Sequence, residues 1–142
     1  MRKIQVGFLM SYDYKLLRNS IPLVYNEADS ITIALDENFK TWSGGSFNVD
    51  DGFFLWLQTF DTQKKIRIYK DNFYDPVLNA MENEVKERKL LAAKMGIGNW
   101  LIQIDSDEYF VDFKSFVDEL KLRNKYLNNP EKTQIQIAGY YI

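Results

Sequence analysis

Three acidic residues stand within four positions at residues 105–108, directly after the apolar run at 100–104. In an extended segment alternate side chains point the same way, so Asp105 and Asp107 would share one side while Ser106 points away. Two carboxylates held that close repel each other unless a cation lies between them. Their hard oxygens suit Mg²⁺, Mn²⁺ or Ca²⁺. The pattern therefore indicates either a metal site or a solvated turn whose acids cap a helix near residue 112.

The amino-acid composition narrows the chemistry further. The 142-residue chain contains no His and no Cys, which excludes disulfides, thiolate nucleophiles, Ser-His-Asp triads and the usual zinc sites. Its net charge is −2 and its basic residues are dispersed, which argues against a nucleic-acid groove. No stretch reaches the roughly 18 apolar residues that span a bilayer. We expect one cytoplasmic domain over residues 1–142. Any chemistry must use carboxylates, Lys, Arg, Tyr or a bound metal, so the composition leaves hard-metal chemistry or none.

Three further side chains could contact a ligand. Asp36 follows an apolar strand, where it could bind a ribose or base or merely begin a turn. The ring of Tyr12 could stack on a base or pack against other aromatic residues. Arg88 could hold a phosphate or base edge, or could pair with Glu84 on a solvated helix face. The loop "WSGG" at 42–45 offers backbone that can approach a ligand closely.

Residue periodicity predicts alternating strands and helices. Apolar runs predict strands, and spacing of three and four residues predicts helices. We expect a kink or break at Pro22 within the first helix, and helix caps at Asp50 or Asp51 and at Asp112. Strands are predicted at 4–10, 31–35, 66–69, 100–104 and 134–142, and helices at 14–28, 51–60, 82–95 and from 113 to a break at 128–130.

This alternation predicts a Rossmann-like α/β fold, a mainly parallel sheet with helices on both faces. Ligands of such sheets bind beyond the carboxyl ends of the strands, near the point where strand order reverses. The second and fourth predicted strands end at Asp36 and Asp105. We therefore expect these acids to face one crevice. No phosphate-binding G-x-x-x-x-G-K-[ST] or strand-linked G-x-G-x-x-G motif is present.

Three blocks, in this order, resemble the family 2 glycosyltransferases of the GT-A fold. They are "KIQVGFLMSYDY", like the family's first strand; "SITIALD", like its second strand with a nucleoside-binding acid; and "KERKLLAAKMGIGNWLIQIDSDEYF", like its helix-Gly-strand run into a D-x-D motif. The resemblance implies the N-terminal part of a GT-A domain that binds a nucleotide-diphosphate sugar, with a UDP-sugar favoured, and Mn²⁺ or Mg²⁺.

The resemblance also implies individual roles. Asp107 would ligate the metal, and Asp105 would contact the ribose or the metal shell. Asp36 would bind the nucleoside, Arg88 would lie beside the base or diphosphate, and Tyr12 would line the base pocket. Transfer would invert the anomeric centre, assisted by a carboxylate base that deprotonates the acceptor hydroxyl. We expect that base and the acceptor-binding part to lie beyond residue 142, so that this chain mainly binds the donor.

Other functions fit parts of the pattern. A haloacid-dehalogenase-like phosphatase also places D-x-D after a strand, but usually after the first one. A metal-dependent nucleotidyltransferase would need a basic phosphate-binding loop, which the sequence does not display. A non-catalytic nucleotide-binding module would keep only the fold. By family analogy the setting would be bacterial polysaccharide or glycoconjugate synthesis, with membrane association left open for a full-length protein. The donor sugar, the acceptor and the oligomeric state are not specified by the sequence.

Overall fold

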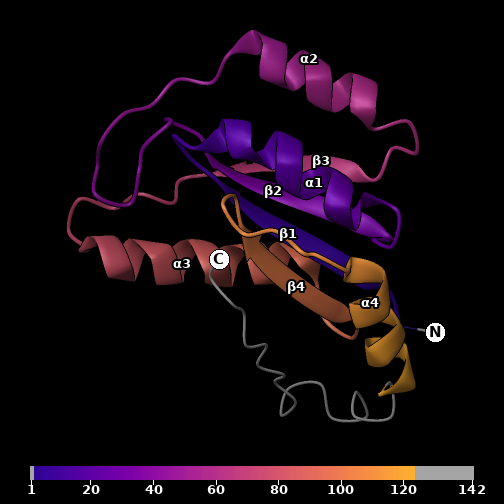
Figure 1. Cartoon of the computed structure of the whole chain (residues 1–142). Helices are drawn as coiled ribbons and strands as arrows, with labels where there is room; N and C mark the ends of the chain where they lie inside the picture. The colour runs from indigo at the N-terminus through magenta and orange to yellow at the C-terminus, as the bar shows by residue number, and fades with distance from the viewer. Residues whose placement is uncertain (1, 124–142) are drawn as a thin grey trace.

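The computed structural model describes residues 2–123 and contains alternating strands and helices (Figure 1). In chain order the elements are β1 (Ile4–Met10), the short 3₁₀ helix η1 (Tyr14–Leu16), α1 (Leu17–Tyr25), β2 (Ser30–Asp36), α2 (Asp51–Phe60), β3 (Ile66–Asp71), α3 (Ala80–Met95), β4 (Trp100–Asp105) and α4 (Phe113–Leu122). The strand predicted at 134–142 lies outside the described residues. No helix within residues 2–123 is both long enough and apolar enough to cross a bilayer.

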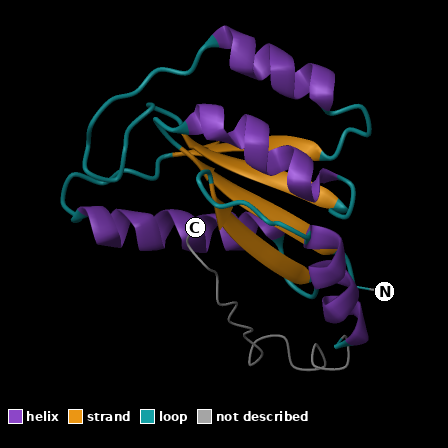
Figure 2. Ribbon diagram, viewed as in Figure 1, coloured by secondary structure: helices purple, strands orange, loops and turns teal. Residues whose placement is uncertain are grey.

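The four strands form one parallel sheet in the order β3-β2-β1-β4 (Figure 2). The predicted α/β fold with a parallel sheet is therefore confirmed. The chain moves outward from β1 to β3 and then crosses back to place β4 on the other side of β1. The strand order thus reverses between β1 and β4, which is where open α/β sheets bind ligands.

Helices cover both faces of this sheet, with α3 on the opposite side from α1 and α2 (Figure 1). The larger core packs residues of α1, α2 and α4 against one face, and a smaller core packs α3 against the other. The central strands β1 and β2 are buried over nearly their whole length. Burial on both faces explains why these two strands are continuous apolar runs in the sequence.

Of the kink or break predicted at Pro22, the break is wrong, because α1 runs continuously from Leu17 to Tyr25, and the kink stays a prediction. Proline removes one helical hydrogen bond, since its nitrogen carries no proton. The same helix buries Leu17, Ile21 and Val24 completely against the sheet. Tertiary packing of an apolar face usually decides whether a helix forms, and here it offsets the cost of the proline.

The helix ends follow the sequence signals closely. Asp50 accepts a hydrogen bond from the Gly52 amide at the start of α2, and Asp112 accepts one from the Ser115 amide at the start of α4. These are two of the predicted caps. Helix α3 begins two residues earlier than predicted, because Asn79 and Glu82 form a reciprocal capping box.

Gly7 in β1 allows α3 to approach the sheet closely. A Cβ atom at this position would lie 2.7 Å from Sδ of Met95 and 3.0 Å from Cδ2 of Leu91. Both distances are shorter than normal van der Waals contact. The missing side chain therefore sets how near α3 sits to β1, and α3 also carries Glu87 and Arg88.

Candidate functional site

A pocket of about 360 Å³ lies beyond the carboxyl ends of β1, β2 and β4. Three chain segments that follow these strands form most of it, and α3 contributes one wall. Its lining comprises residues 9–13, 40–43 and 105–107 together with Asp36, Ala80 and Glu87. The pocket therefore spans the reversal of strand order between β1 and β4, as the sequence predicts for a ligand site.

The D-x-D segment has its two acids in the pocket and its serine turned inward. Ser106 is buried, and its hydroxyl donates to the carbonyl oxygen of Leu9 over 2.8 Å. Asp105 and Asp107 both line the pocket. Glu108 instead closes the turn, because its Oε2 accepts a hydrogen bond from the amide of Asp105. The third acid of the motif thus has a structural contact, while the first two face the cavity.

Asp13 adds a third carboxylate that the sequence analysis did not select. It follows β1 and its Oδ1 lies 3.3 Å from the hydroxyl oxygen of Ser106. Burial raises the pKa of Asp13 above its ordinary value, and the nearby carboxylates of Asp107 and Asp105 raise it further. These three acids therefore form a region of high negative potential across the ends of β1 and β4.

Asp36 lies in the same pocket but is already fully engaged. Its Oδ1 accepts hydrogen bonds from the amides of Asn38 and Lys40, and its Oδ2 accepts from those of Phe73 and Tyr74, at distances between 2.9 and 3.2 Å. Its side chain is 3% exposed. Asp36 therefore ties the loops after β2 and β3 together, and its predicted contact with a nucleoside stays a prediction.

Arg88 supports the site from outside. Its Nη2 lies 2.7 Å from Oδ1 of Asp105 and 2.9 Å from Oε1 of Glu84, and the arginine is not among the residues that line the pocket. The predicted pairing with Glu84 is thus confirmed. Because Arg88 holds one oxygen of Asp105, it fixes the orientation of this carboxylate. A direct contact with a base or diphosphate stays a prediction.

Tyr12 and Trp42 give the pocket its aromatic surface. Tyr12 is 72% exposed, so one face of its ring is available for stacking. Trp42 belongs to the loop at 42–45, and hydrogen bonds fix this loop to α3. The carbonyl oxygen of Trp42 accepts a hydrogen bond from Nδ2 of Asn83, and its indole Nε1 donates to Oε2 of Glu87.

Glu87 is the second pocket acid that the sequence analysis missed. It is 5% exposed, and the Trp42 indole lies 2.5 Å from its Oε2. Burial raises the pKa of Glu87 to about 7, with smaller contributions from neighbouring charges that include Asp36 and Asp105. One signal could have identified this residue. Leu91 and Met95 are four residues apart, and continuing that spacing backwards places Glu87 and Asn83 on the same buried stripe.

The donor atoms of the pocket fit a hard divalent cation that a ligand helps to coordinate. All candidate ligands are carboxylate oxygens, and Asp107 is exposed and makes no hydrogen bond to a described residue. Within residues 2–123, no group of three or more acidic, His or Cys side chains is gathered closely enough to hold a metal ion alone. Mg²⁺ commonly binds one or two carboxylates and completes its shell with water and substrate phosphate.

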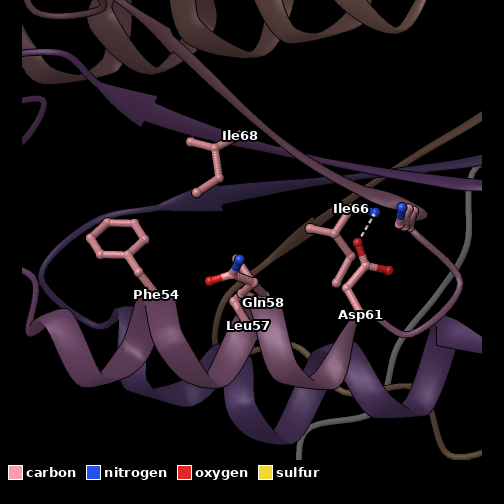
Figure 3. Close-up of a pocket in the computed structure, with 7 residues that line it drawn as sticks. Phe54, Leu57, Gln58, Asp61, Ile66 and Ile68 are labelled. Atoms are coloured by element: carbon pink, nitrogen blue, oxygen red, sulfur yellow. Dashed lines mark hydrogen bonds between the residues drawn. The ribbon is translucent and has the colours of Figure 1, made fainter.

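A second hollow lies between α2 and β3 and has no comparable chemistry (Figure 3). Its volume is about 540 Å³ and its walls include Phe54, Leu57, Ile66 and Ile68. Its one carboxylate, Asp61, is occupied by the backbone amides of residues 65 and 66 and by a tyrosine hydroxyl. Of these two pockets, the first therefore contains the acids able to bind a ligand.

Comparison of the chain with protein-family models, with curated proteins and with solved structures finds no match. The resemblance to family 2 glycosyltransferases consequently depends on the three sequence blocks.

Proposed function

We propose that the pocket binds a nucleotide-diphosphate sugar together with Mn²⁺ or Mg²⁺, and that the chain takes part in transferring the sugar to an acceptor hydroxyl. The single observation that carries this proposal is the position of Asp105 and Asp107 in one pocket at the reversal of strand order. This is the place where a parallel α/β sheet binds nucleotides. The D-x-D resemblance supplies the reaction class.

The charge of the pocket supports a metal-assisted mode of binding. Its lining contains the carboxyl groups of Asp13, Asp36, Glu87, Asp105 and Asp107. The lining contains one basic residue, Lys40, whose Nζ donates to the hydroxyl of Ser46. A diphosphate would be repelled by such a surface unless a cation lay between them. A nucleotide diphosphate is therefore expected to bind only together with a divalent ion.

Four pocket residues have a defined task under this proposal. Asp107 would ligate the cation, and Asp105 would contact the cation or ribose with the oxygen that Arg88 leaves free. Tyr12 and Trp42 would provide ring surface for the base. When bound, the cation would stabilise the negative charge of the nucleotide-diphosphate leaving group. Under this proposal the described residues would bind the donor, and we assign none of them as the base that activates the acceptor.

A binding measurement with the 142-residue chain tests the proposal. Isothermal titration with UDP should show binding in the presence of Mn²⁺ and none after chelation. Asp107→Asn should weaken that binding by roughly tenfold or more, because a neutral amide is a poorer metal ligand. Glu119→Gln is the matched control, since Glu119 pairs with Arg123 on α4 and does not line the pocket. Binding of UDP that is indifferent to both Mn²⁺ and Asp107 would overturn the proposal.

The alternatives give different outcomes in the same assays. The D-x-D follows β4, whereas a haloacid-dehalogenase-like phosphatase usually carries it after the first strand. Release of phosphate from a generic phosphoester would nonetheless favour that class. A non-catalytic module would bind UDP with Mn²⁺ but would neither transfer nor hydrolyse the sugar of any UDP-sugar. Release of UDP from a UDP-sugar by this chain would favour the transferase over the module.

A further inference from the structure

We infer that Glu87, and not Asp36, is the carboxylate that reads the nucleobase, by accepting a hydrogen bond from a ring N–H of the base. This inference rests on the proposed function and deepens it, because it defines which bases the pocket accepts. The carboxylate accepts only, so it selects bases that present a ring N–H, namely uracil, thymine and guanine. Cytosine and adenine present a bare ring nitrogen at the corresponding position.

Asp36 and Glu87 differ in how many further hydrogen bonds their carboxylates can accept. Both oxygens of Asp36 already accept two backbone amides each. Glu87 accepts one hydrogen bond, from the Trp42 indole to Oε2, and its Oε1 accepts none from the residues that the structure describes. Among the described residues, Oε1 of Glu87 is not one of the buried polar atoms that lack a partner, so it is open to the pocket and a ligand N–H can reach it. Of these two acids, only Glu87 has acceptor capacity left.

The charged neighbours of Glu87 do not supply a donor to its Oε1. Arg88 is the adjacent cation on α3, but its guanidinium is bound to Asp105 and Glu84. From the strand ends, the groups that act on Glu87 are the carboxylates of Asp36 and Asp105, which disfavour its charge. A neutral N–H donor from the ligand suits such a site, because it satisfies the oxygen without placing a further charge there.

The position of Glu87 in the pocket places it at the base end. The cation and the diphosphate belong beside Asp107, so the nucleoside extends away from β4 toward the loop that follows β2. Trp42 of that loop lines the pocket, and Glu87 of α3, which the Trp42 indole contacts, lines it beside Trp42. The indole offers an aromatic surface for the base. Its bond to Glu87, together with the bond from Asn83 to its carbonyl oxygen, fixes both groups before a ligand arrives.

Paired nucleotides test the inference. Titrations with Mn²⁺ at about pH 8, where Glu87 is mostly ionised, compare UDP with CDP and GDP with ADP. Each pair is matched in size and differs in whether the ring nitrogen carries a proton. We expect the wild-type chain to prefer UDP to CDP, or GDP to ADP, by roughly tenfold or more. Glu87→Gln, which can both donate and accept, should reduce that ratio to near one, and Glu119→Gln should leave it unchanged.

The outcomes are distinguishable from those of the proposed function. Because each ratio is measured on one preparation, partial unfolding of Glu87→Gln lowers both affinities and leaves the ratio unaffected. Mn²⁺-dependent binding without any preference within either pair, or a preference that survives Glu87→Gln, overturns the role of Glu87 and leaves donor binding intact. Failure of the wild-type chain to bind any of the four nucleotides with Mn²⁺ overturns the proposed function, and this inference falls with it.

Discussion

Asp36 and Asp105 each end a parallel strand beside β1, one on either side, and their carboxylates have opposite surroundings. Asp36 ends β2, which lies between β1 and β3, and the segments after β2 and β3 supply amides to its oxygens. Asp105 ends β4, which has one neighbour in the described sheet, and its side chain is 37% exposed. Acids with the same position in the sequence pattern can therefore serve the fold or face a ligand, and the neighbouring loops decide which.

Removing the carboxylate of Asp36 should give the largest loss of stability. Asp36→Ala leaves four backbone amides without their acceptor, and we expect a loss of about 3 to 5 kcal/mol in the free energy of unfolding. Urea denaturation measures it. A loss below about 1 kcal/mol would show that Asp36 does not stabilise the fold more than an ordinary surface acid does.

Glu87 should make stability depend on pH. Its folded pKa of about 7 lies above the ordinary 4.5, so the folded chain binds an extra proton between these values and stability falls as pH rises through that window. The fall is on the order of 3 kcal/mol. Glu87→Gln lacks this contribution, so its stability relative to wild type should increase between about pH 5 and about pH 8. Urea denaturation across that pH range measures the free energy of unfolding of both proteins. A constant difference between Glu87→Gln and wild type at all pH values would contradict the prediction.

The ion pair of Arg88 with Asp105 should contribute less. Both side chains are about one third exposed, and solvent screens such a pair, so Arg88→Ala should cost about 0.5 to 1 kcal/mol. The cost should shrink at high ionic strength, because salt screens exposed charges. Denaturation at low and high salt measures both effects. A cost that does not depend on salt would indicate packing of the arginine stem instead of its charge.

Asp107 should show the smallest effect on stability. Its side chain is exposed and accepts no hydrogen bond from a described residue, so Asp107→Ala should stay within about 0.5 kcal/mol of wild type. Denaturation in the absence of Mn²⁺ measures this, with Asp36→Ala run in parallel. Equal losses for the two variants would erase the contrast between the structural acid and the exposed one.

The fold was predictable because its signals are local. Apolar runs, helical spacing and caps at Asp50 and Asp112 identified the described strands and helices, and the alternation of these elements identified the parallel sheet. The break at Pro22 was predicted wrongly, because a local rule cannot weigh the burial of the helix face.

The candidate site was only partly predictable, because its contacts come from distant segments. Asp105 and Asp107 were recognisable from their spacing and from the strand before them. The engagement of Asp36 depends on amides 37 and 38 residues further along the chain. Glu87 was hidden in a charged stretch that resembles a solvated helix face, although Trp42, 45 positions away, covers it.

Gly7 has a consequence for ligand selection. Its missing Cβ lets Leu91 and Met95 rest against β1, and Glu87 lies one helical turn before Leu91 on the same stripe. A methyl group added at Gly7 would push α3 away from β1. This shift would change how far Glu87 reaches into the pocket toward a bound base. The wall of the pocket that α3 forms is thus adjusted from the middle of β1, through a residue that does not line the pocket.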